Sequence, residues 1–186
     1  MATTRTAAAG VALAGAVALS TAALVQPVSA KDGDHDLKAA KAIAAQFTSE
    51  TRAINKGYER TEHCVDWREA PEGAAPAGSY MGYHYVKPEI LDSVIEARRP
   101  EAVLYKEDAH GNRVLTGIEY IVVAEDQVAP YDDSDRPSLW GHDFHGPMPG
   151  HVDGMPVHYD LHVWTHDDNP DGAWSAWNTS KDLTCP

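Results

Sequence analysis

The clearest helical pattern in the chain runs from Leu37 to about Lys56. Its apolar residues recur every three or four positions, which places them along one side of a helix. Gly57 follows, and glycine is typical of the residue that ends a helix. The pattern predicts one long amphipathic helix lying across a sheet. The apolar stripe consists of Leu37, Ala40, Ala44, Phe47, Thr51, Ile54 and Tyr58.

Four later segments have the alternation or the β-branched and aromatic composition of strands. Two of them, 101–107 and 114–124, are joined through Gly111-Asn112, and this turn chemistry predicts a hairpin. The other two segments are 79–87, which carries Tyr83 and Tyr85 on one face, and 157–165.

Two connections complete the prediction. Pro88 suits the first turn of a short helix that Pro100 ends. Residues 125–156 are rich in proline and glycine and too long for an ordinary connection, but aromatic residues such as Trp140 and Phe144 need a surface to pack on, which predicts an ordered loop. The expected fold is therefore α+β: a long N-terminal helix and a short helix packed on an antiparallel sheet of four or five strands, with a long ordered loop.

The first 30 residues have the pattern of a secretory signal peptide. Arg5 is their only charge, an apolar run follows, and Val28-Ser29-Ala30 supplies the small residues that signal peptidase reads. The run is nearly long enough to be a membrane anchor, but small residues dominate it and no basic cluster follows it. We expect cleavage after Ala30 and a secreted or extracytoplasmic protein, with residues 31–186 forming one globular domain and no membrane attachment after cleavage.

The charge and the cysteines narrow the function further. The formal net charge is -13, which disfavours nucleic acid and anionic lipid as partners and favours cations. Cys64 and Cys185 are the only cysteines, and in an exported chain they are expected to form a disulfide. Such a bridge would tie the end of the chain to the end of the first helix. A metal-binding pair is the alternative, but the short spacing of a zinc knuckle is absent.

Six of the ten histidines lie between position 141 and position 166. On the strand 157–165, His158, Asp160 and His162 alternate with apolar residues and so share one face. Because the rise per residue is about 3.3 Å, His158 and His162 lie about 13 Å apart and cannot hold one ion together. A metal site must therefore combine one of them with ligands from other segments.

The best donors elsewhere are His84, on the strand with Tyr83 and Tyr85, and Glu119, in the hairpin. His151, in the long loop, is placed to close the site. The predicted metal ligands are thus His84, Glu119, His151, His158 and His162, and imidazole and carboxylate groups suit zinc, copper, iron or manganese. His142 and His145 are weaker candidates, and His35, His63, His110 and His166 are expected to be exposed. The alternative is that the histidines only make structural hydrogen bonds.

Several motifs resemble those of a family of uncharacterised exported bacterial proteins. This resemblance covers nearly all of the mature chain and implies a single secreted domain, but no activity or residue role comes with it. The cupin metal motifs match poorly, and no nucleophile elbow is present. The motifs that carry the resemblance are Met81–Val86, Pro100-Glu101 with Leu104-Tyr105, Gly117–Tyr120, Gly146–His151, His158–Trp164, Asn169-Pro170 and Cys185.

Three functional hypotheses follow from the sequence. The first is a secreted protein whose His/Glu-lined pocket binds a divalent transition metal, with or without enzymatic activity. The second is a non-enzymatic module that binds a carbohydrate or another small molecule through a groove of aromatic rings. The third is an exported structural or interaction protein without a small-molecule site. The rings of the second hypothesis are Tyr83, Tyr85, Trp140, Trp164, Trp174 and Trp177.

Overall fold

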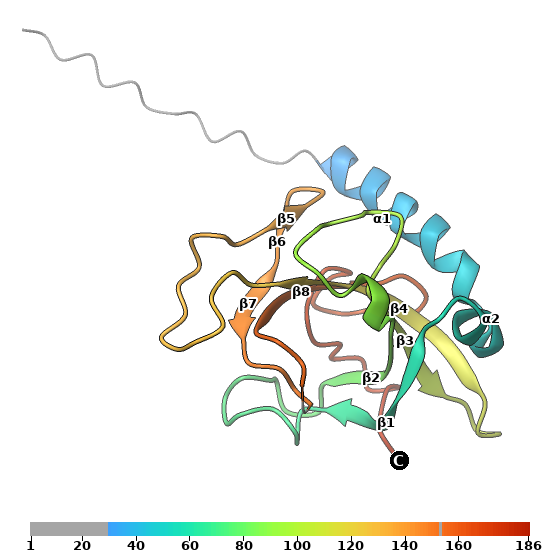
Figure 1. The fold of residues 1–186 in the computed structure, drawn as a ribbon. Coiled ribbons are helices and arrows are strands. Elements are labelled where there is room, and N and C mark those ends of the chain that lie inside the picture. The colour runs from blue at the N-terminus through green and yellow to red at the C-terminus, as the bar shows by residue number, and fades with distance from the viewer. Residues whose placement is uncertain (1–29, 153) are drawn as a thin grey trace, which may run out of the picture.

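A six-stranded antiparallel sheet forms the centre of the protein (Figure 1). The computed structural model describes residues 30–152 and 154–186. The α+β class is confirmed, and the sheet has six strands instead of the four or five expected. In spatial order the strands are β1 (Glu59–Asp66), β2 (Tyr80–Val86), β3 (Ala102–Glu107), β4 (Arg113–Val123), β8 (His158–Trp164) and β7 (His145–Met148).

Residues 37–56 are helical in large part, but the prediction that they form one continuous helix is wrong. The helical region is divided into α1 (Ala30–Ala44), a 3-10 turn η1 (Ala45–Phe47) and α2 (Glu50–Asn55). Ser49 interrupts it with extended backbone angles, φ -122° and ψ 127°. The break exposes the carbonyl of Phe47, which accepts a hydrogen bond of 2.6 Å from the hydroxyl of Tyr105 on β3. A hydrogen bond to the sheet thus replaces a hydrogen bond within the helix. The apolar stripe in the sequence gives no sign of this exchange.

The prediction of a short helix from Pro88 is also wrong, except for the first turn. Only the 3-10 turn η2 (Pro88–Ile90) forms, and the chain then runs irregularly to Pro100. The backbone carbonyl of Asp92 accepts a hydrogen bond from the amide of Val123, at the end of β4. The segment is therefore held by the end of a central strand and lacks the continuous backbone hydrogen bonds of a helix.

The sequence patterns did not predict two strands of the six-stranded sheet, β1 and β7. β1 begins three residues after Lys56, the expected end of the long helix, in a segment for which no strand was predicted. β7 lies inside the long loop, together with the small β5–β6 pair (Ser138–Leu139 and His142–Asp143). Pro147 argued against a strand at β7, because proline cannot donate a backbone hydrogen bond. A proline is tolerated in a strand at the edge of a sheet, however, and β7 is an edge strand.

Both faces of the sheet are buried. The helices cover one face (Figure 1), and there Ala44, Phe47 and Ala53 pack against residues from β2, β3, β4 and β8. On the opposite face Tyr80, Leu104, Trp164 and Leu183 form a second cluster, in which the C-terminal segment lies against the strands. The indole of Trp164 donates to the carbonyl of Ser175 at 2.7 Å. The C-terminal segment therefore contributes directly to the burial of the second face.

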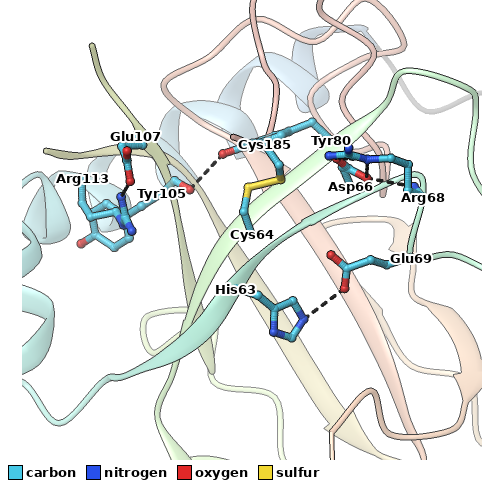
Figure 2. The surroundings of a disulfide bond; sticks show 10 residues. All are labelled: His63, Cys64, Asp66, Arg68, Glu69, Tyr80, Tyr105, Glu107, Arg113 and Cys185. Carbon is cyan, nitrogen blue, oxygen red and sulfur yellow. Dashed lines mark hydrogen bonds and ion pairs between the residues drawn. A yellow bond between two sulfur atoms is a disulfide. The ribbon is translucent and has the colours of Figure 1, made fainter. Parts of the chain in front are cut away.

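The disulfide expected between Cys64 and Cys185 is present (Figure 2). It joins the C-terminal segment to β1, not to the end of the first helix, because Cys64 lies in a strand. Both cysteines pack against the second cluster. The bridge closes a loop with a sequence separation of 121, and long loops give the largest entropic effect on the unfolded chain.

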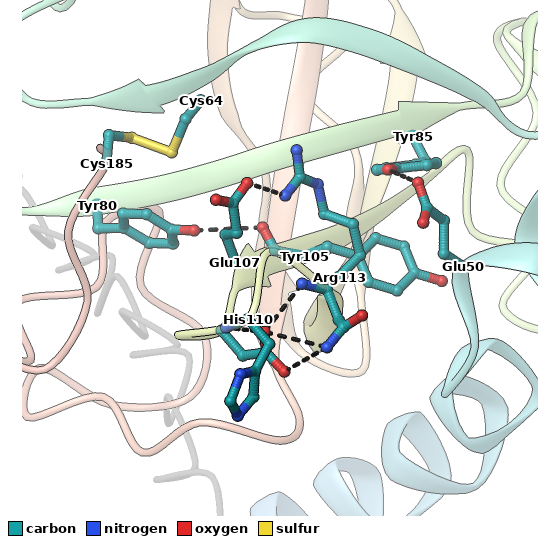
Figure 3. Close-up of polar contacts among 11 residues, drawn as sticks. Glu50, Cys64, Tyr80, Tyr85, Tyr105, Glu107, His110, Arg113 and Cys185 are labelled. Carbon is teal, nitrogen blue, oxygen red and sulfur yellow. Dashed lines mark hydrogen bonds and ion pairs between the residues drawn. A yellow bond between two sulfur atoms is a disulfide. The ribbon is translucent and has the colours of Figure 1, made fainter.

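Polar contacts connect the hairpin and the helices to the sheet (Figure 3). The guanidinium of Arg113 lies 3.6 Å from the centroid of the Tyr83 ring and pairs with Glu107 across the β3–β4 hairpin. The hydroxyl of Tyr85 donates to Glu50 on α2. These contacts fix the register of the hairpin and the position of α2 relative to β2.

The predicted signal peptide lies almost entirely outside the described residues, which begin at Ala30. Among the helices that the structure describes, none has the length and apolar character needed to cross a membrane.

Gly82 leaves the space through which Tyr80 reaches β3. The Tyr80 hydroxyl donates to the carbonyl of Tyr105 at 3.2 Å, and a Cβ on Gly82 would lie 2.6 Å from that carbonyl oxygen and 2.7 Å from the hydroxyl. Gly82 also has a φ of +94°. Both the steric limit and the backbone angle favour glycine at this position.

We expect Gly82→Ala to lower the free energy of unfolding more than Gly111→Ala does. Both glycines have positive φ, but a Cβ on Gly111 would have no neighbour within 4 Å. In the Gly111→Ala control the free energy of unfolding should therefore fall by only about 1–2 kcal/mol, the cost of a side chain in the left-handed backbone region. In Gly82→Ala it should fall by about 1–3 kcal/mol more, because the added methyl group overpacks the site. Urea unfolding measures both values, and equal losses would contradict the close contact described here.

Candidate metal centre

Three strands bring three potential metal ligands together on the second face of the sheet. His84 comes from β2, Glu119 from β4 and His162 from β8, and Glu119 lies directly opposite His162 in the β4–β8 register. β3 separates His84 from Glu119, and the β3 residue opposite Glu119 is Ala102. Because Ala102 projects only a methyl group, the longer side chains of His84 and Glu119 can meet above it.

The distances in this group fit co-ligands of one ion better than hydrogen bonds. His84 Nε2 lies 3.6 Å from Glu119 Oε2, and His162 Nε2 lies 3.6 Å from Glu119 Oε1. One ligand atom from each residue lies within 4.8 Å of the other two. A hydrogen bond would need about 2.7–3.2 Å, whereas two ligands bound at about 2.1 Å to a tetrahedral ion lie about 3.4 Å apart. The group could therefore hold a metal ion.

Burial makes this arrangement costly without a further partner. The side chains of Glu119 and His162 are 5% and 1% exposed, and that of His84 is 14% exposed. Within the described part of the chain, Glu119 Oε2 and both ring nitrogens of His162 are buried without a hydrogen-bond partner. Each buried polar atom without a partner lowers the free energy of unfolding by about 1–3 kcal/mol. A cation between the three side chains would satisfy the Glu119 oxygen and one His162 nitrogen.

The pKa values show how strongly these groups interact. Burial raises the pKa of Glu119 to about 7, although the nearby His162 opposes the rise. Burial favours the neutral form of His162, but the carboxylates of Glu119 and Asp160 outweigh it and raise its pKa to about 9. Burial, helped by His162 and His151, lowers the pKa of His84 to about 3. Near neutral pH the group therefore has a neutral His84 ready to bind a metal and a protonated His162.

Asp160 and His145 extend the group along β8 and β7. Asp160 Oδ1 lies 3.6 Å from Nδ1 of His162 and 3.6 Å from Nδ1 of His145. Burial raises the pKa of Asp160, but the two imidazoles facing it outweigh this effect and lower it. Asp160 therefore carries a negative charge beside the nitrogen of His162 that points away from Glu119. Metal-binding histidines commonly have such a carboxylate, which fixes the ring and raises its basicity.

The other two predicted ligands lie outside this group. His158 shares the face but uses Nδ1 in a 3.0 Å contact with the carbonyl of Pro156, and its distance along β8 keeps it from the His162 position, as strand geometry predicts. The ring of His151 lies 5.2 Å from the ring of His158. His151 is exposed in the loop before β8, near enough for its charge to affect His84.

Sequence reasoning left Asp160 out of the ligand set and ranked His145 low. The alternation on β8 placed Asp160 on the same face as His162, so this signal was present in the sequence. His145 gave no comparable signal, because its nearness to Asp160 depends on β7 pairing with β8, where His145 and Asp160 are directly opposite. The long loop concealed that pairing.

The aromatic rings proposed for a binding groove pack mainly in the interior. Tyr83 and Tyr85 belong to the core beneath the helices, and Trp140 and Trp174 pack against it. Trp164 belongs to the second cluster, on the other face of the sheet. These five rings therefore belong to the core or pack against it.

We expect Asp160→Asn to weaken metal binding at this centre by about 10–100-fold, as loss of a second-layer carboxylate usually does. The substitution keeps the shape of the side chain but removes the charge beside His162. Isothermal titration with zinc measures the change, and Asp168→Asn, at an exposed position on the following turn, is the matched control. Equal affinities for the two variants would contradict the orienting role of Asp160.

Comparison of the chain with family models, with curated proteins and with solved structures gives no match. The resemblance to exported bacterial proteins therefore stays a prediction.

Proposed function

We propose that the protein is an exported metal-binding protein that holds one divalent transition metal ion with His84, Glu119 and His162. The observation that carries the proposal is the convergence of two imidazoles and a carboxylate, all largely buried, at distances suited to a common ion. A hydrophobic interior excludes such groups unless they are paired or bind a metal.

The ligand chemistry selects a class of metals. Two imidazole nitrogens and one carboxylate oxygen suit zinc, iron, manganese and copper, while calcium and magnesium prefer sites made only of oxygen. Three protein ligands leave at least one coordination position for water or another molecule, as in catalytic zinc sites and mononuclear iron sites. The proposed centre is therefore able to bind an external ligand as well as the ion.

The direction of access follows from the burial of the three ligands. His84 is the most exposed of them, so an external ligand approaches from the β2 side. His151 lies in an exposed loop close enough to influence His84. In this proposal His151 lies near the entrance and is not one of the metal ligands.

Export is part of the proposal and has separate support. The disulfide between Cys64 and Cys185 is typical of oxidising compartments outside the cytosol. It agrees with the signal peptide expected from residues 1–30. The excess of acidic residues would also raise the local concentration of cations at the surface.

We expect the natively purified protein to contain one transition metal ion per chain and the metal-free protein to bind zinc with an increase in melting temperature. Glu119→Gln and His84→Gln should each weaken zinc binding by more than about 100-fold, which exceeds the usual effect of a second-layer partner. Elemental analysis and calorimetric titration measure these effects.

The control for these variants is His110→Gln, in the exposed turn of the β3–β4 hairpin, which should bind zinc as the unmodified protein does. Circular dichroism checks that each variant is folded. If the purified protein carries no metal, and zinc, copper, manganese and ferrous iron all leave the melting temperature unchanged, the proposal is wrong.

Metal affinity should rise with pH between about pH 6 and about pH 9. The pKa values of Glu119 and His162 are raised to about 7 and about 9, so the metal-free site retains protons that the ion must displace. Each displaced proton should give up to about a tenfold gain in affinity per pH unit. The gain should level off once His162 has lost its proton. Titration with zinc in a chelator buffer measures the profile, and a flat profile would contradict protonated ligands in the metal-free site.

A further inference from the structure

A second polar site lies on the helical side of the protein, away from the metal centre. A cavity of about 230 Å³ opens between the end of α2, the start of β1 and the irregular segment after β2. This volume is smaller than the roughly 300–1,000 Å³ of pockets that hold drug-sized molecules. None of its lining residues belongs to the metal group. They are Gln46, Phe47, Lys56, Tyr58, Lys87, Ile90, Arg98 and Arg99.

The charge of this cavity is opposite to that of the whole chain. Four of its eight lining residues are cationic and none is acidic, although the chain carries a formal net charge of -13. The cations come from three separate segments: Lys56 follows α2, Lys87 follows β2, and Arg98 and Arg99 precede β3. Opposite charges attract. The cations that line this one hollow therefore favour an anion as its ligand.

Neighbouring acids neutralise only part of this charge. Lys87 donates to the carbonyl of Lys56 at 2.6 Å and lies 3.8 Å from Glu89. Arg99 pairs with Glu96 at 2.9 Å. Among the residues that the structure describes, neither Lys56 nor Arg98 forms an ion pair. These two side chains remain available to an anion.

The remaining lining is apolar or aromatic. Phe47 and Tyr58 are core residues with 3% and 4% exposure, and their rings contact each other with centroids 5.1 Å apart. The Tyr58 hydroxyl is already bound to the carbonyl of Pro100 at 2.6 Å, so the ring offers mainly its apolar surface. Ile90 adds an aliphatic wall. A ligand here needs both an anionic group and a small apolar body.

We propose that this cavity binds a small organic oxyanion, a carboxylate or a phosphate ester on a compact apolar body, through Lys56 and Arg98. The planar guanidinium group matches both carboxylate and phosphate in a bidentate geometry. The apolar body of the ligand lies against Phe47 and Ile90. The metal group lies on the other face of the sheet, so this site is independent of the proposed metal binding.

Titration of the full mature chain at low ionic strength tests the proposal, because salt screens exposed charges. Benzoate and phenyl phosphate are the probes for the two oxyanions, and benzyl alcohol is the neutral probe of similar size. Either anion should bind with a dissociation constant below about 5 mM, and the neutral probe should not bind. The anion that binds more tightly shows whether the site prefers a carboxylate or a phosphate ester. No binding of either anion at that concentration overturns the proposal.

Two variants locate the binding. Arg98→Gln and Lys56→Gln should each weaken binding of the preferred anion by about tenfold, the loss of one charge-assisted hydrogen bond. Lys181→Gln, at an exposed position outside the cavity, should leave it unchanged. All three positions are exposed, so melting temperatures should stay equal.

Two other results would overturn the proposal. One is an equal loss in the Lys181→Gln control, which would indicate a general charge effect. The other is binding of heparin with no binding of the small anions, which would identify a polyanion surface instead. Repeating the titration with protein that was stripped of metal and then dialysed free of chelator separates this site from the metal centre, because the expected affinity for the anion does not depend on the metal.

Discussion

The carboxylate of Glu119 is buried between two imidazoles, and this burial constrains much of the surrounding structure. A carboxylate in such a place has few stable options: it takes up a proton, pairs with a cationic group, or binds a metal. Its pKa is raised to about 7 and its Oε2 has no hydrogen-bond partner within the described chain. The neighbouring His162 supplies part of the compensation, and a metal ion would supply the rest.

The sheet makes room for these large polar groups by using small residues beside them. Ala102 lies opposite Glu119, and Gly117 lies two residues earlier on the same face of β4. A Cβ on Gly117 would come within 2.5 Å of the carbonyl oxygen of Val163. Gly82 precedes His84 by two residues and has its own steric limit at Tyr105. Small and large side chains therefore alternate across the strands, as close packing requires.

The C-terminal segment and the disulfide complete this face. Leu183 and the Cys64–Cys185 bridge pack with Tyr80, Leu104 and Trp164, and the ring of Trp164 is stacked with that of His162 at a centroid distance of 6.3 Å. The end of the chain is thus linked to the site through one aromatic contact. The helices cover the opposite face, where the cationic cavity lies. The two proposed sites therefore occupy different faces of one sheet, and each can be changed without directly touching the other.

The sequence by itself determined which residues share a face and which segments form the hairpin, because strand alternation and turn chemistry are local properties. It therefore placed His158, Asp160 and His162 together, separated His158 from His162 by distance, and paired the two cysteines. Only the tertiary structure decided that β8 lies beside β4 with His162 opposite Glu119, and that β7 brings His145 to Asp160. The broken helix at Ser49 and the missing helix after Ile90 have the same origin, since each exchanges local hydrogen bonds for contacts with β3 or β4. Strand order and register depend on contacts between distant segments, and no local pattern encodes which distant segment will be the neighbour.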